Sequence, residues 1–577
     1  MSNFSKLFSK APTEVPKFSG FDMSHINIGT MKVGTLVPVL VEPLYPNDKI
    51  SVGANLNVQL PPMASDFIGK VDLRMEAFFV PYRILWQGWQ RFYNFRSVDT
   101  YVSVVDALPK IVINDAQYNF NQENFNRYVG SGTLMDYLGF KINRENISFT
   151  GNFELKNPLP FLAYHMIYDR WYRDKTIQRP CFASPDEISN MINSQALEDD
   201  KEKYSAAMMP YRYGGDGINS VFMPSESFII DEETGDEQSR GFADYLLADG
   251  HCLFDLRQRN WSKDYFTIAT PYPQAGEIPA KVVFNSSGAT AEFTIAALRA
   301  ANSLQKFAEK RNIAGGEYDE QILADWGVRP SDSVIQHPIY IGSFTQSVYN
   351  RSVLQSANGI PTPIGETAPY SRNPFAQTVG AAFGKSSVLG SDSIIKNFRA
   401  KEHGLIMILA SIVPHAFYGS GTRKYLNYSS FSDFPNPNFV AIGDQEIKEG
   451  EITDNSAFFF PDISDERTFG YTQRYAEKKF HLDEVHGLLR DGQSLQHFAV
   501  QRTFDDVDSI STEFIQIGTD ALDNVSAIEG DISNFGAWYE IAFKEQMVSA
   551  FPQYSIPTLG DEKHTSTIIM DKGGKRL

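Results

Sequence analysis

The sequence predicts a mainly β protein in which antiparallel strands form a sandwich or a barrel. Apolar and polar residues alternate over 50–60 and again over 71–77, with the two-residue period of a strand that has one buried face. Aromatic residues make up 13% of the 577 residues, including 43 Phe and 27 Tyr, and they favour strands and large interfaces. The length alone favours several domains, but a large all-β shell with long insertions would be one domain.

The remaining β segments are predicted in order along the chain. Residues 1–30 are polar and show no period, so we expect an extended arm that is ordered only where a neighbour holds it. The apolar run 35–41 predicts a strand buried on both faces, and Pro38 within it indicates an edge position or a bulge. Prolines at 43, 46, 61, 62 and 81 separate these first strands. Later strands are predicted at 339–350, 404–413, 456–460 and 512–518.

Two helices are predicted. Pro160 suits the first turn of a helix that runs to about Arg173, with an apolar side made of Leu162, Met166, and Tyr168 or Trp171. A second helix is predicted from Thr294 to Arg311 and ends at Gly315-Gly316. Because these helices do not alternate regularly with strands, a doubly wound α/β fold is disfavoured.

The segment 185–292 differs in composition from the rest of the chain. It carries two acidic clusters, many Gly and Ser residues and little periodicity, so we interpret it as an insertion carried on the surface. Five of its residues are predicted to form an exposed acidic loop: Asp231, Glu232, Glu233, Asp236 and Glu237.

Charge and composition restrict the class of protein. A net charge of −18 argues against a surface that grips nucleic acid throughout, although a locally basic face stays open. With only two cysteines, Cys181 and Cys252, a disulfide scaffold is excluded and folding in a reducing cytoplasm fits. The most apolar run, Gly404–Pro414, is too short to span a membrane, and the first residues lack the apolar core of a signal peptide.

The motifs that would indicate catalysis are weak. His481 and His486 in HLDEVH are five residues apart, so they cannot share the helical face that a zinc site needs, and an incidental pair is favoured. GSGTRK from Gly419 lacks the spacing of a phosphate-binding loop and is interpreted as a glycine-rich turn. The GxSxG nucleophile motif is absent. We therefore expect no enzyme, no cofactor and no metal site.

One basic and aromatic segment, YRILWQGWQRFYNFR from Tyr82 to Arg96, leaves two interpretations open. Arg with aromatic residues can stack bases and neutralise phosphates of single-stranded nucleic acid. The same residue types also pack cores and subunit contacts, which is the favoured interpretation. The candidate residues are Arg83, Trp86, Trp89, Arg91, Phe92 and Arg96, with Trp171 and Arg173 in a second such cluster.

Seven segments together resemble one family. They are FDMSHINIGTMKVGTLVPVLVEPLYPND from Phe21, FFVPYRILWQGWQRF from Phe78, LPFLAYHMIYDRWYRD from Leu159, TIAALRAANSLQKFAEKRNIAGGEYDEQILADWGV from Thr294, HPIYIGS from His337, EHGLIMILASI from Glu402 and FGYTQRYAEKKF from Phe469. In this order they resemble the major capsid proteins of the Microviridae, small single-stranded-DNA bacteriophages, and the gokushovirus branch in particular. Residues 185–292 and about the last seventy match poorly.

The resemblance implies an eight-stranded antiparallel jelly roll of the viral capsid type, with long loop insertions and a few helices. Residues 31–184 and 293–577 would form the shell domain, with 1–30 as its N-terminal arm and a basic tail at the C-terminus. Residues 185–292 would be a candidate threefold protrusion, and this exposed insertion would attach to the bacterial host. The chain would assemble into a T=1 icosahedral shell around a circular single-stranded DNA genome.

The resemblance also implies partners and a location. The chain would bind itself through pentamers, a small basic DNA-binding virion protein, a pilot or minor virion protein, the packaged DNA and a bacterial surface receptor, for which a glycan is one candidate. It would lie in the virion after assembly in the host bacterial cytoplasm. A carbohydrate-binding β-sandwich or adhesin without shell assembly is the main alternative. A jelly-roll hydrolase is a third, although no carboxylate pair in the sequence identifies one.

Overall fold

The computed structural model describes residues 18–60, 68–86, 111–114, 128–140, 152–182, 228–230, 237–239, 247, 249–273, 318–328, 336–348, 392–453, 467–504, 507–526 and 536–551, together with single helical positions at 89, 93, 299, 303, 306, 307 and 310. All contacts given below are between these residues.

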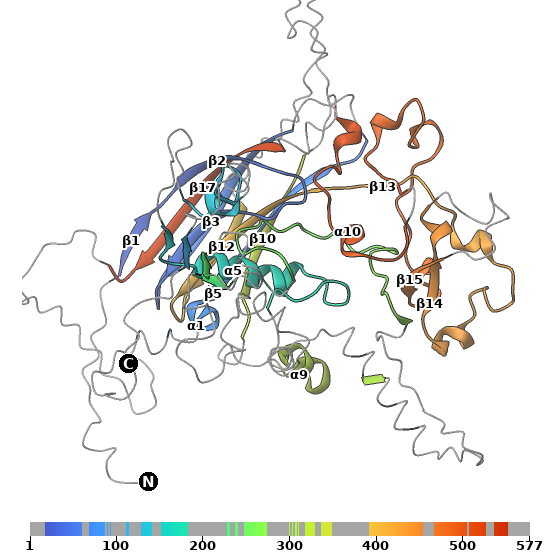
Figure 1. The fold of residues 1–577 in the computed structure, drawn as a ribbon, viewed down its shortest axis with the longest axis horizontal. Coiled ribbons are helices and arrows are strands. Elements are labelled where there is room, and N and C mark those ends of the chain that lie inside the picture. The colour runs from blue at the N-terminus through green and yellow to red at the C-terminus, as the bar shows by residue number, and fades with distance from the viewer. Residues whose placement is uncertain are drawn as a thin grey trace, which may run out of the picture.

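Two antiparallel sheets form the centre of the molecule (Figure 1). The first sheet has the order β1–β17–β4–β11, and β2 also pairs with β17; its strands are β1 (Ser19–Asp22), β2 (His25–Met31), β4 (Lys49–Gln59), β11 (Asp392–Arg399) and β17 (Ala537–Ser549). The second sheet has the order β10–β5–β12–β3, formed by β3 (Val37–Leu44), β5 (Val71–Pro81), β10 (Ile339–Val348) and β12 (Gly404–Pro414). The prediction of a mainly β protein with antiparallel strands is confirmed.

The main core lies between the two sheets. In β4 the buried positions alternate with exposed or half-buried ones, as the period of two predicts, and Ile50, Val52 and Leu56 point inward. In β17, Tyr539, Ile541 and Phe543 do the same from the neighbouring strand. Each such side chain contributes about 1.5–3 kcal/mol when fully buried, so the alternation fixes which face of each strand is internal.

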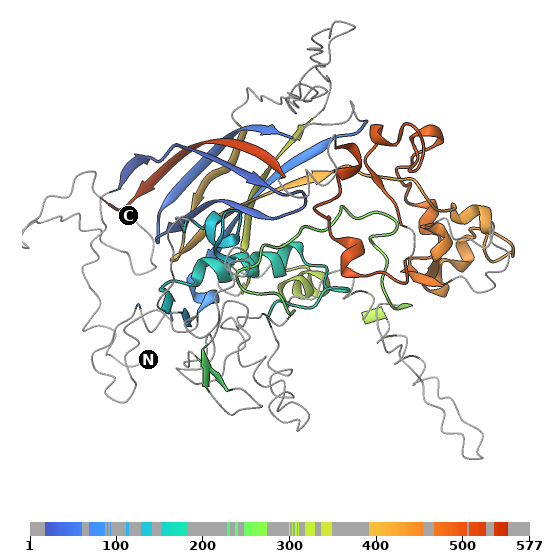
Figure 2. The same cartoon turned by 45° about the horizontal axis from the view of Figure 1, so that its top comes forward.

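A second core covers the other face of the second sheet. All residues of β12 are buried, because helix α5 (Leu159–Ile167) and the π-helical turn η2 (Tyr168–Tyr172) pack on the side away from the first sheet (Figure 2). Pro158 caps α5, and proline in its first turn fits the prediction of a helix from Pro160. The short helices α1 (Tyr82–Leu85) and α4 (Leu134–Tyr137) contribute buried residues to the same core.

A third core supports a distal lobe, defined here as residues 417–453 and 467–502, at the end of the molecule opposite β1 (Figure 1). Its strands are β13 (Phe417–Tyr418), β14 (Gln445–Lys448), β15 (Thr468–Thr472) and β16 (Gln501–Arg502). Its 3-10 turns are η8 (Lys424–Asn427), η9 (Pro437–Ile442), η10 (Glu449–Glu451), η11 (Ala476–Lys478), η12 (Gly487–Leu489) and η13 (Gln496–Phe498). Helix α10 (Thr512–Ile515) and the turn η14 (Asp523–Val525) follow the lobe.

Elsewhere β6 (Ile111–Asn114) pairs with β7 (Asn152–Leu155), β8 (Phe228–Ile230) pairs with β9 (Glu237–Ser239), and α9 covers Tyr318–Trp326.

Several predicted elements are confirmed. Strands at 35–41, 50–60, 71–77, 339–350 and 404–413 correspond to β3, β4, β5, β10 and β12. Pro38 lies in an edge strand, and the pairing of β3 with β12 shifts register between Leu40 and Pro38, as a proline there predicts. The described positions within 294–311 are helical, at 299, 303, 306, 307 and 310.

Three predictions need a different description. The strand predicted at 512–518 is wrong, because Ser511 caps helix α10 by accepting a hydrogen bond from Phe514 N at 3.3 Å. Residues 19–31, expected to be an arm held by a neighbour, form β1 and β2 and pair with the chain's own β17. The strand predicted at 456–460 lies outside the described residues.

Residues 249–273, which fall within the predicted insertion 185–292, contribute buried side chains to the interior. Leu253 and Phe254 lie in the second core, and Arg257 is 2% exposed. Arg257 forms an ion pair with Asp249, with Nη1 and Oδ2 2.7 Å apart, and its Nε donates to His165 Nδ1 at 3.1 Å. A segment tied to α5 in this way is not part of a surface insertion, so we remove 247–273 from that proposal; residues 274–292 lie outside the described residues.

Candidate assembly surfaces

The basic and aromatic segment that begins at Tyr82 is anchored in the second core. Trp86 is 8% exposed and packs in that core with Ile84 and Leu85. The Nε of Arg83 donates to Glu402 Oε2 at 2.7 Å and its Nη1 donates to Gln336 Oε1 at 3.3 Å. Arg83 therefore joins α1 to the loop before β12.

The helical positions after α1 extend the aromatic cluster towards solvent. The Trp89 ring lies 4.7 Å from Tyr82 and 5.6 Å from His403, measured between ring centroids. The Tyr93 ring lies 4.4 Å from the same His403, at a tilt of 55°, and Tyr93 is 62% exposed. Arg91, Phe92 and Arg96 lie outside the described residues.

The second cluster divides into a buried Arg and an exposed Trp. Arg173 pairs with Asp169, with Nε and Oδ1 2.9 Å apart, and its Nη1 donates to the Gln178 carbonyl at 2.9 Å. Trp171 is 42% exposed, and its Nε1 donates to the Pro338 carbonyl at 3.1 Å. Its ring lies 5.6 Å from the exposed Tyr340. Thus Arg173 holds the turn after η2, whereas Trp171 presents an aromatic surface.

The acidic loop lies almost entirely outside the described residues. Asp231, Glu232, Glu233 and Asp236 are among those not described, and Glu237 is the first residue of β9. The two short strands β8 and β9 pair in an antiparallel hairpin on either side of these positions.

The distal lobe exposes many large apolar side chains. Phe431 is 75% exposed and Leu426 is 62% exposed, although both types are normally buried. Others in the lobe with large exposed fractions are Tyr425, Phe434, Val440, Phe480, Leu488 and Leu495. Apolar groups gathered on one part of a surface are typical of a protein interaction site.

Two smaller apolar surfaces lie elsewhere. On α9, Trp326 is 80% exposed, and the ion pair between Arg170 and Glu320, 2.7 Å from Nη1 to Oε1, holds this helix against η2. On the outer face of the first sheet, Ile26 and Ile28 of β2 are 61% and 74% exposed. An exposed Trp is a frequent anchor of protein interfaces.

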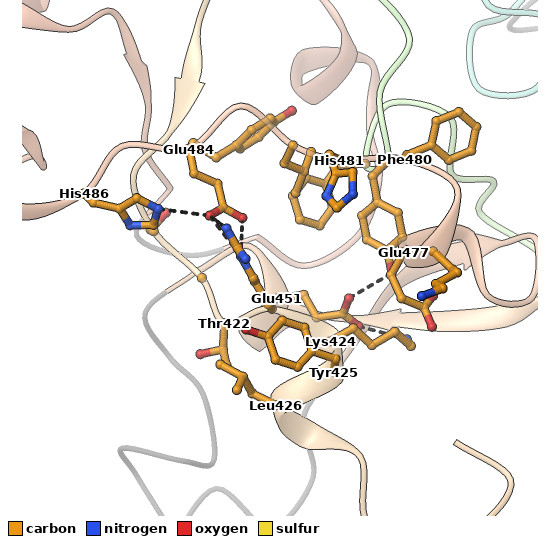
Figure 3. Close-up of a pocket in the computed structure, with 18 of the residues that line it drawn as sticks. Thr422, Lys424, Tyr425, Leu426, Glu451, Glu477, Phe480, His481, Glu484 and His486 are labelled. Atoms are coloured by element: carbon orange, nitrogen blue, oxygen red, sulfur yellow. Dashed lines mark hydrogen bonds and ion pairs between the residues drawn. The ribbon is translucent and has the colours of Figure 1, made fainter. Parts of the chain in front are cut away.

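A cavity of about 1260 Å³ opens in the distal lobe (Figure 3). Its charged groups are largely paired with one another. Arg423 Nε donates to both oxygens of Glu484, at 2.8 and 3.0 Å, and His486 Nε2 lies 3.3 Å from Glu484 Oε2. Deeper in the cavity, Glu451 accepts from Tyr265 Oη at 2.9 Å and from Lys424 Nζ at 3.1 Å. These ion pairs brace the loops that form the cavity walls.

The two weak catalytic motifs both lie in this lobe. Glu484 of HLDEVH is held by Arg423 and His486, while Asp483 lies 3.5 Å from His415. Burial raises the pKa of Glu451, and the charge of Lys424 opposes that rise. In the part of the chain that the structure describes, no group of three or more His, Cys, Asp or Glu residues is placed to hold a metal ion.

The GSGTRK segment is a turn that packs against η10. Gly421 has φ +89°, and a Cβ there would lie 2.1 Å from the Glu451 carbonyl oxygen. Thr422 N donates to the Gly450 carbonyl at 2.9 Å. Glycine is required by this close approach, which accounts for the motif without a phosphate ligand.

The family model described as "Capsid protein (F protein)" matches residues 9–559, nearly the whole chain. The chain belongs to this family of capsid proteins. Three relatives are similar over almost their entire length, each a capsid protein VP1. The protein of Chlamydia phage 1 is 25% identical over 96% of this chain and 97% of its own, and that of Bdellovibrio phage phiMH2K is 24% identical over 95% and 97%. That of Spiroplasma virus 4 is 23% identical over 96% of this chain and 99% of its own.

The resemblance to the Microviridae capsid proteins is thereby confirmed. Membership in a capsid family indicates a structural protein whose function lies in its contacts with other molecules. Within the described residues, no helix has the length and apolar character that crossing a bilayer requires.

For a capsid protein, the apolar residues of the distal lobe and α9 are the main features that sequence reasoning missed. Phe431 and Phe434 lie in FSDFPNPNF, a run of Phe, Pro and Asn without strand or helix period. Such a composition indicates aromatic side chains on irregular backbone, which is how interface anchors are often presented. Trp326 lies in the segment from Thr294 to Val328, which sequence reasoning used only as evidence of the family resemblance and did not assign to an interface.

Proposed function

We propose that this chain is the major capsid protein of a small bacteriophage and assembles into a T=1 icosahedral shell around circular single-stranded DNA. The observation that carries the proposal is membership of a capsid family over residues 9–559. The adhesin alternative lacks comparable support, because the three relatives that align over their whole length are named as capsid proteins.

The strand order supports an eight-stranded jelly roll as the shell fold. If β1 and β2 count as one position beside β17, the two sheets have four positions each. From β2 to β5 the chain alternates between the sheets; β10 then pairs with β5, and β10, β11, β12 and β17 alternate again. The chain thus alternates between the two sheets both before and after the paired strands β5 and β10. This is the connectivity of a jelly roll.

Subunit contacts are proposed at the exposed apolar surfaces. The distal lobe carries Phe431 and Leu426, and α9 carries Trp326, all more than half exposed in the single chain. Burying such side chains against neighbouring subunits would supply the desolvated anchors of a shell. Icosahedral closure needs several different contacts on each subunit, which the distal lobe, α9 and the exposed Ile26 and Ile28 of β2 would provide.

The contacts with the genome and the other virion proteins also belong to the proposal. Trp171 and Tyr340 offer exposed rings beside Arg170, whose guanidinium lies 5.4 Å from the Trp171 ring centroid. Stacking of bases on these rings is the local DNA contact that we propose. The small basic DNA-binding protein, the pilot or minor protein and the host receptor follow only from the family resemblance.

The test is assembly of the chain expressed with its neighbouring phage genes. We expect isometric particles by negative-stain electron microscopy and sedimentation.

Phe431→Ser should leave a folded subunit, because the side chain is exposed, but should abolish or strongly reduce particles. Gln493→Ser, an exposed polar position in the same lobe, is the matched control and should assemble like the wild type. A wild-type chain that remains a monomer under all conditions contradicts the shell function; normal assembly of Phe431→Ser contradicts only the placement of this contact.

A further inference from the structure

The N-terminal strands meet β17 at an interruption. β1 pairs with the C-terminal half of β17 from Asp22↔Gln546, and β2 pairs with its N-terminal half as far as His25↔Phe543. The two strands thus lie one after the other along the same edge of β17. The break between them, at Met23 and Ser24, lies opposite Lys544 and Glu545.

Residue 545 fixes this break through its backbone. Met23 N donates to the Glu545 carbonyl at 3.0 Å, and Glu545 N donates to Ser24 Oγ at 3.2 Å. Ser24 in turn donates from its N and its Oγ to Asp22 Oδ1, at 3.1 and 2.5 Å. At the break, the Ser24 hydroxyl therefore accepts the hydrogen bond that a backbone carbonyl would accept in a regular strand pairing.

The side chain of Glu545 points into the core between the sheets. It follows the inward alternation of Phe543 and Met547, and its exposed fraction is 0%. Neither carboxylate oxygen has a hydrogen-bond partner among the described residues. An ionised carboxylate in such a position loses its hydration and has no hydrogen bonds in exchange, whereas the protonated form costs far less.

The groups that face Glu545 come from three strands. His25 of β2 places Nδ1 3.7 Å from Glu545 Oε2, and the same nitrogen lies 3.0 Å from the Met23 carbonyl oxygen. Glu42 approaches from β3 in the opposite sheet, and its own pKa is raised by burial. On β4 the paired residue is the apolar Val52, and Lys544 lies on the exposed face of β17.

Burial, and then the charge of Glu42, raise the pKa of Glu545 to about 7, while His25 opposes the rise.

We propose that Glu545, Glu42 and His25 form a proton-dependent latch that holds β1 and β2 on the edge of β17. In the closed latch Glu545 is protonated and neutral. Ionisation places a charge without hydrogen bonds beside Glu42, and opening of the break relieves it by admitting water.

The direction of the pH dependence follows from the raised pKa. Protonation of Glu545 stabilises the closed state fully below the ordinary carboxyl pKa of 4.5, and this stabilisation is lost as the pH rises through about 7. Alkaline pH should therefore favour opening of the N-terminal strands and so expose the edge of β17 more often; an edge of this kind pairs with other chains. The latch lies within one subunit and does not depend on the shell function.

The test is amide hydrogen exchange of the full chain at about pH 5.5 and about pH 8.5, corrected for intrinsic exchange rates. We expect the protection of amides in 19–31 to fall about thirty-fold, the ratio for a carboxyl whose pKa drops from about 7 to 4.5 on opening. Glu545→Gln keeps the shape and removes the charge, so its protection should not change with pH. Glu540→Gln, on the exposed face of the same strand, should behave like the wild type.

Two further variants test the neighbours and serve if Glu545→Gln does not fold. Glu42→Gln removes the negative charge that raises the pKa of Glu545, so the midpoint of the transition should move to lower pH. His25→Gln removes the group that lowers this pKa, so the midpoint should move to higher pH. The proposal is overturned if the wild type shows no transition in 19–31, if Glu545→Gln retains it, or if the two neighbour variants do not shift it in opposite directions.

Discussion

Gly421 illustrates how one residue sets the shape of the distal lobe. Its positive φ and its lack of a Cβ let the turn pack directly on η10, because a Cβ at this position would lie 2.1 Å from the Glu451 carbonyl oxygen. Glu451 lies at that point with Lys424 and Tyr265 bound to its carboxylate. A change at Gly421 therefore acts on the ion pair that braces the cavity.

We expect Gly421→Ala to lower the free energy of unfolding by about 1–3 kcal/mol, because the added Cβ meets backbone atoms that cannot move aside. Gly492→Ala is the matched control, since Gly492 has φ +73° and open space around its Cβ position. Gly492→Ala should be destabilised by the strain of a positive φ, but not by a steric clash of the added Cβ. Urea unfolding of both variants measures the difference. Equal losses would show that the contact with Glu451 is unimportant.

At the scale of the elements, partly buried ion pairs join segments that are far apart in sequence. Glu76 of β5 accepts from Arg259 Nη1 at 2.6 Å and from Tyr172 Oη at 2.5 Å. Arg259 also donates to Ser411 Oγ of β12 at 3.1 Å. The second sheet, η2 and the segment 249–273 are thus held at one point, which is why that segment cannot be a surface insertion.

Glu76→Ala should destabilise the chain by about 3–5 kcal/mol, because it leaves the partly buried Arg259 without its counter-ion. Glu540→Ala, on the exposed face of β17, removes a carboxylate of the same type and should change stability by about 0.5 kcal/mol or less. Both free energies come from urea unfolding followed by tryptophan fluorescence. A loss for Glu76→Ala no larger than that of Glu540→Ala would contradict the bridging function of this ion pair.

At the scale of the whole molecule, the sheets and the second core form a body from which other segments extend. The distal lobe projects from one end of the sheets (Figure 1). Phe182 and Leu247, on either side of the segment 183–246, both lie in the second core. Because the chain returns to the core at 247–249, removal of the intervening segment need not disturb either sheet.

We expect a phage whose capsid protein lacks 195–246 to form particles that no longer attach to the host. The deletion spares Asp249 and Arg257, which hold the returning segment to α5. Electron microscopy measures particle formation, and adsorption to host cells measures attachment. A longer deletion through 285 is the comparison and should fail to fold, since it removes Leu253 and Phe254 from the core. Normal adsorption of the shorter deletion would contradict the receptor function.

The sequence predicted the strands whose side chains alternate cleanly or run continuously apolar. β4 and β5 were evident because the pattern of burial along each strand is a local property. In β17 burial alternates from Ala537 to Ser549, but the sequence does not show it cleanly, because Trp538 and Ala542 at outward positions are apolar and Glu545 at an inward position is charged. A buried carboxylate breaks the pattern that identifies a strand, and that exception is where we propose the latch.

The sequence by itself determined the β class, the strands β3, β4, β5, β10 and β12, the helix that begins near Pro160 and, through ordered family segments, the resemblance to capsid proteins. Tertiary structure alone decided which strand lies beside which, because β17 pairs with β1, β2 and β4 across some 500 positions of sequence. It also decided that Arg83 and Arg173 bind carboxylates of the same chain, whereas Phe431 and Trp326 face outward. Local periodicity reveals which face of a segment is buried, but a side chain's partners depend on contacts between distant segments.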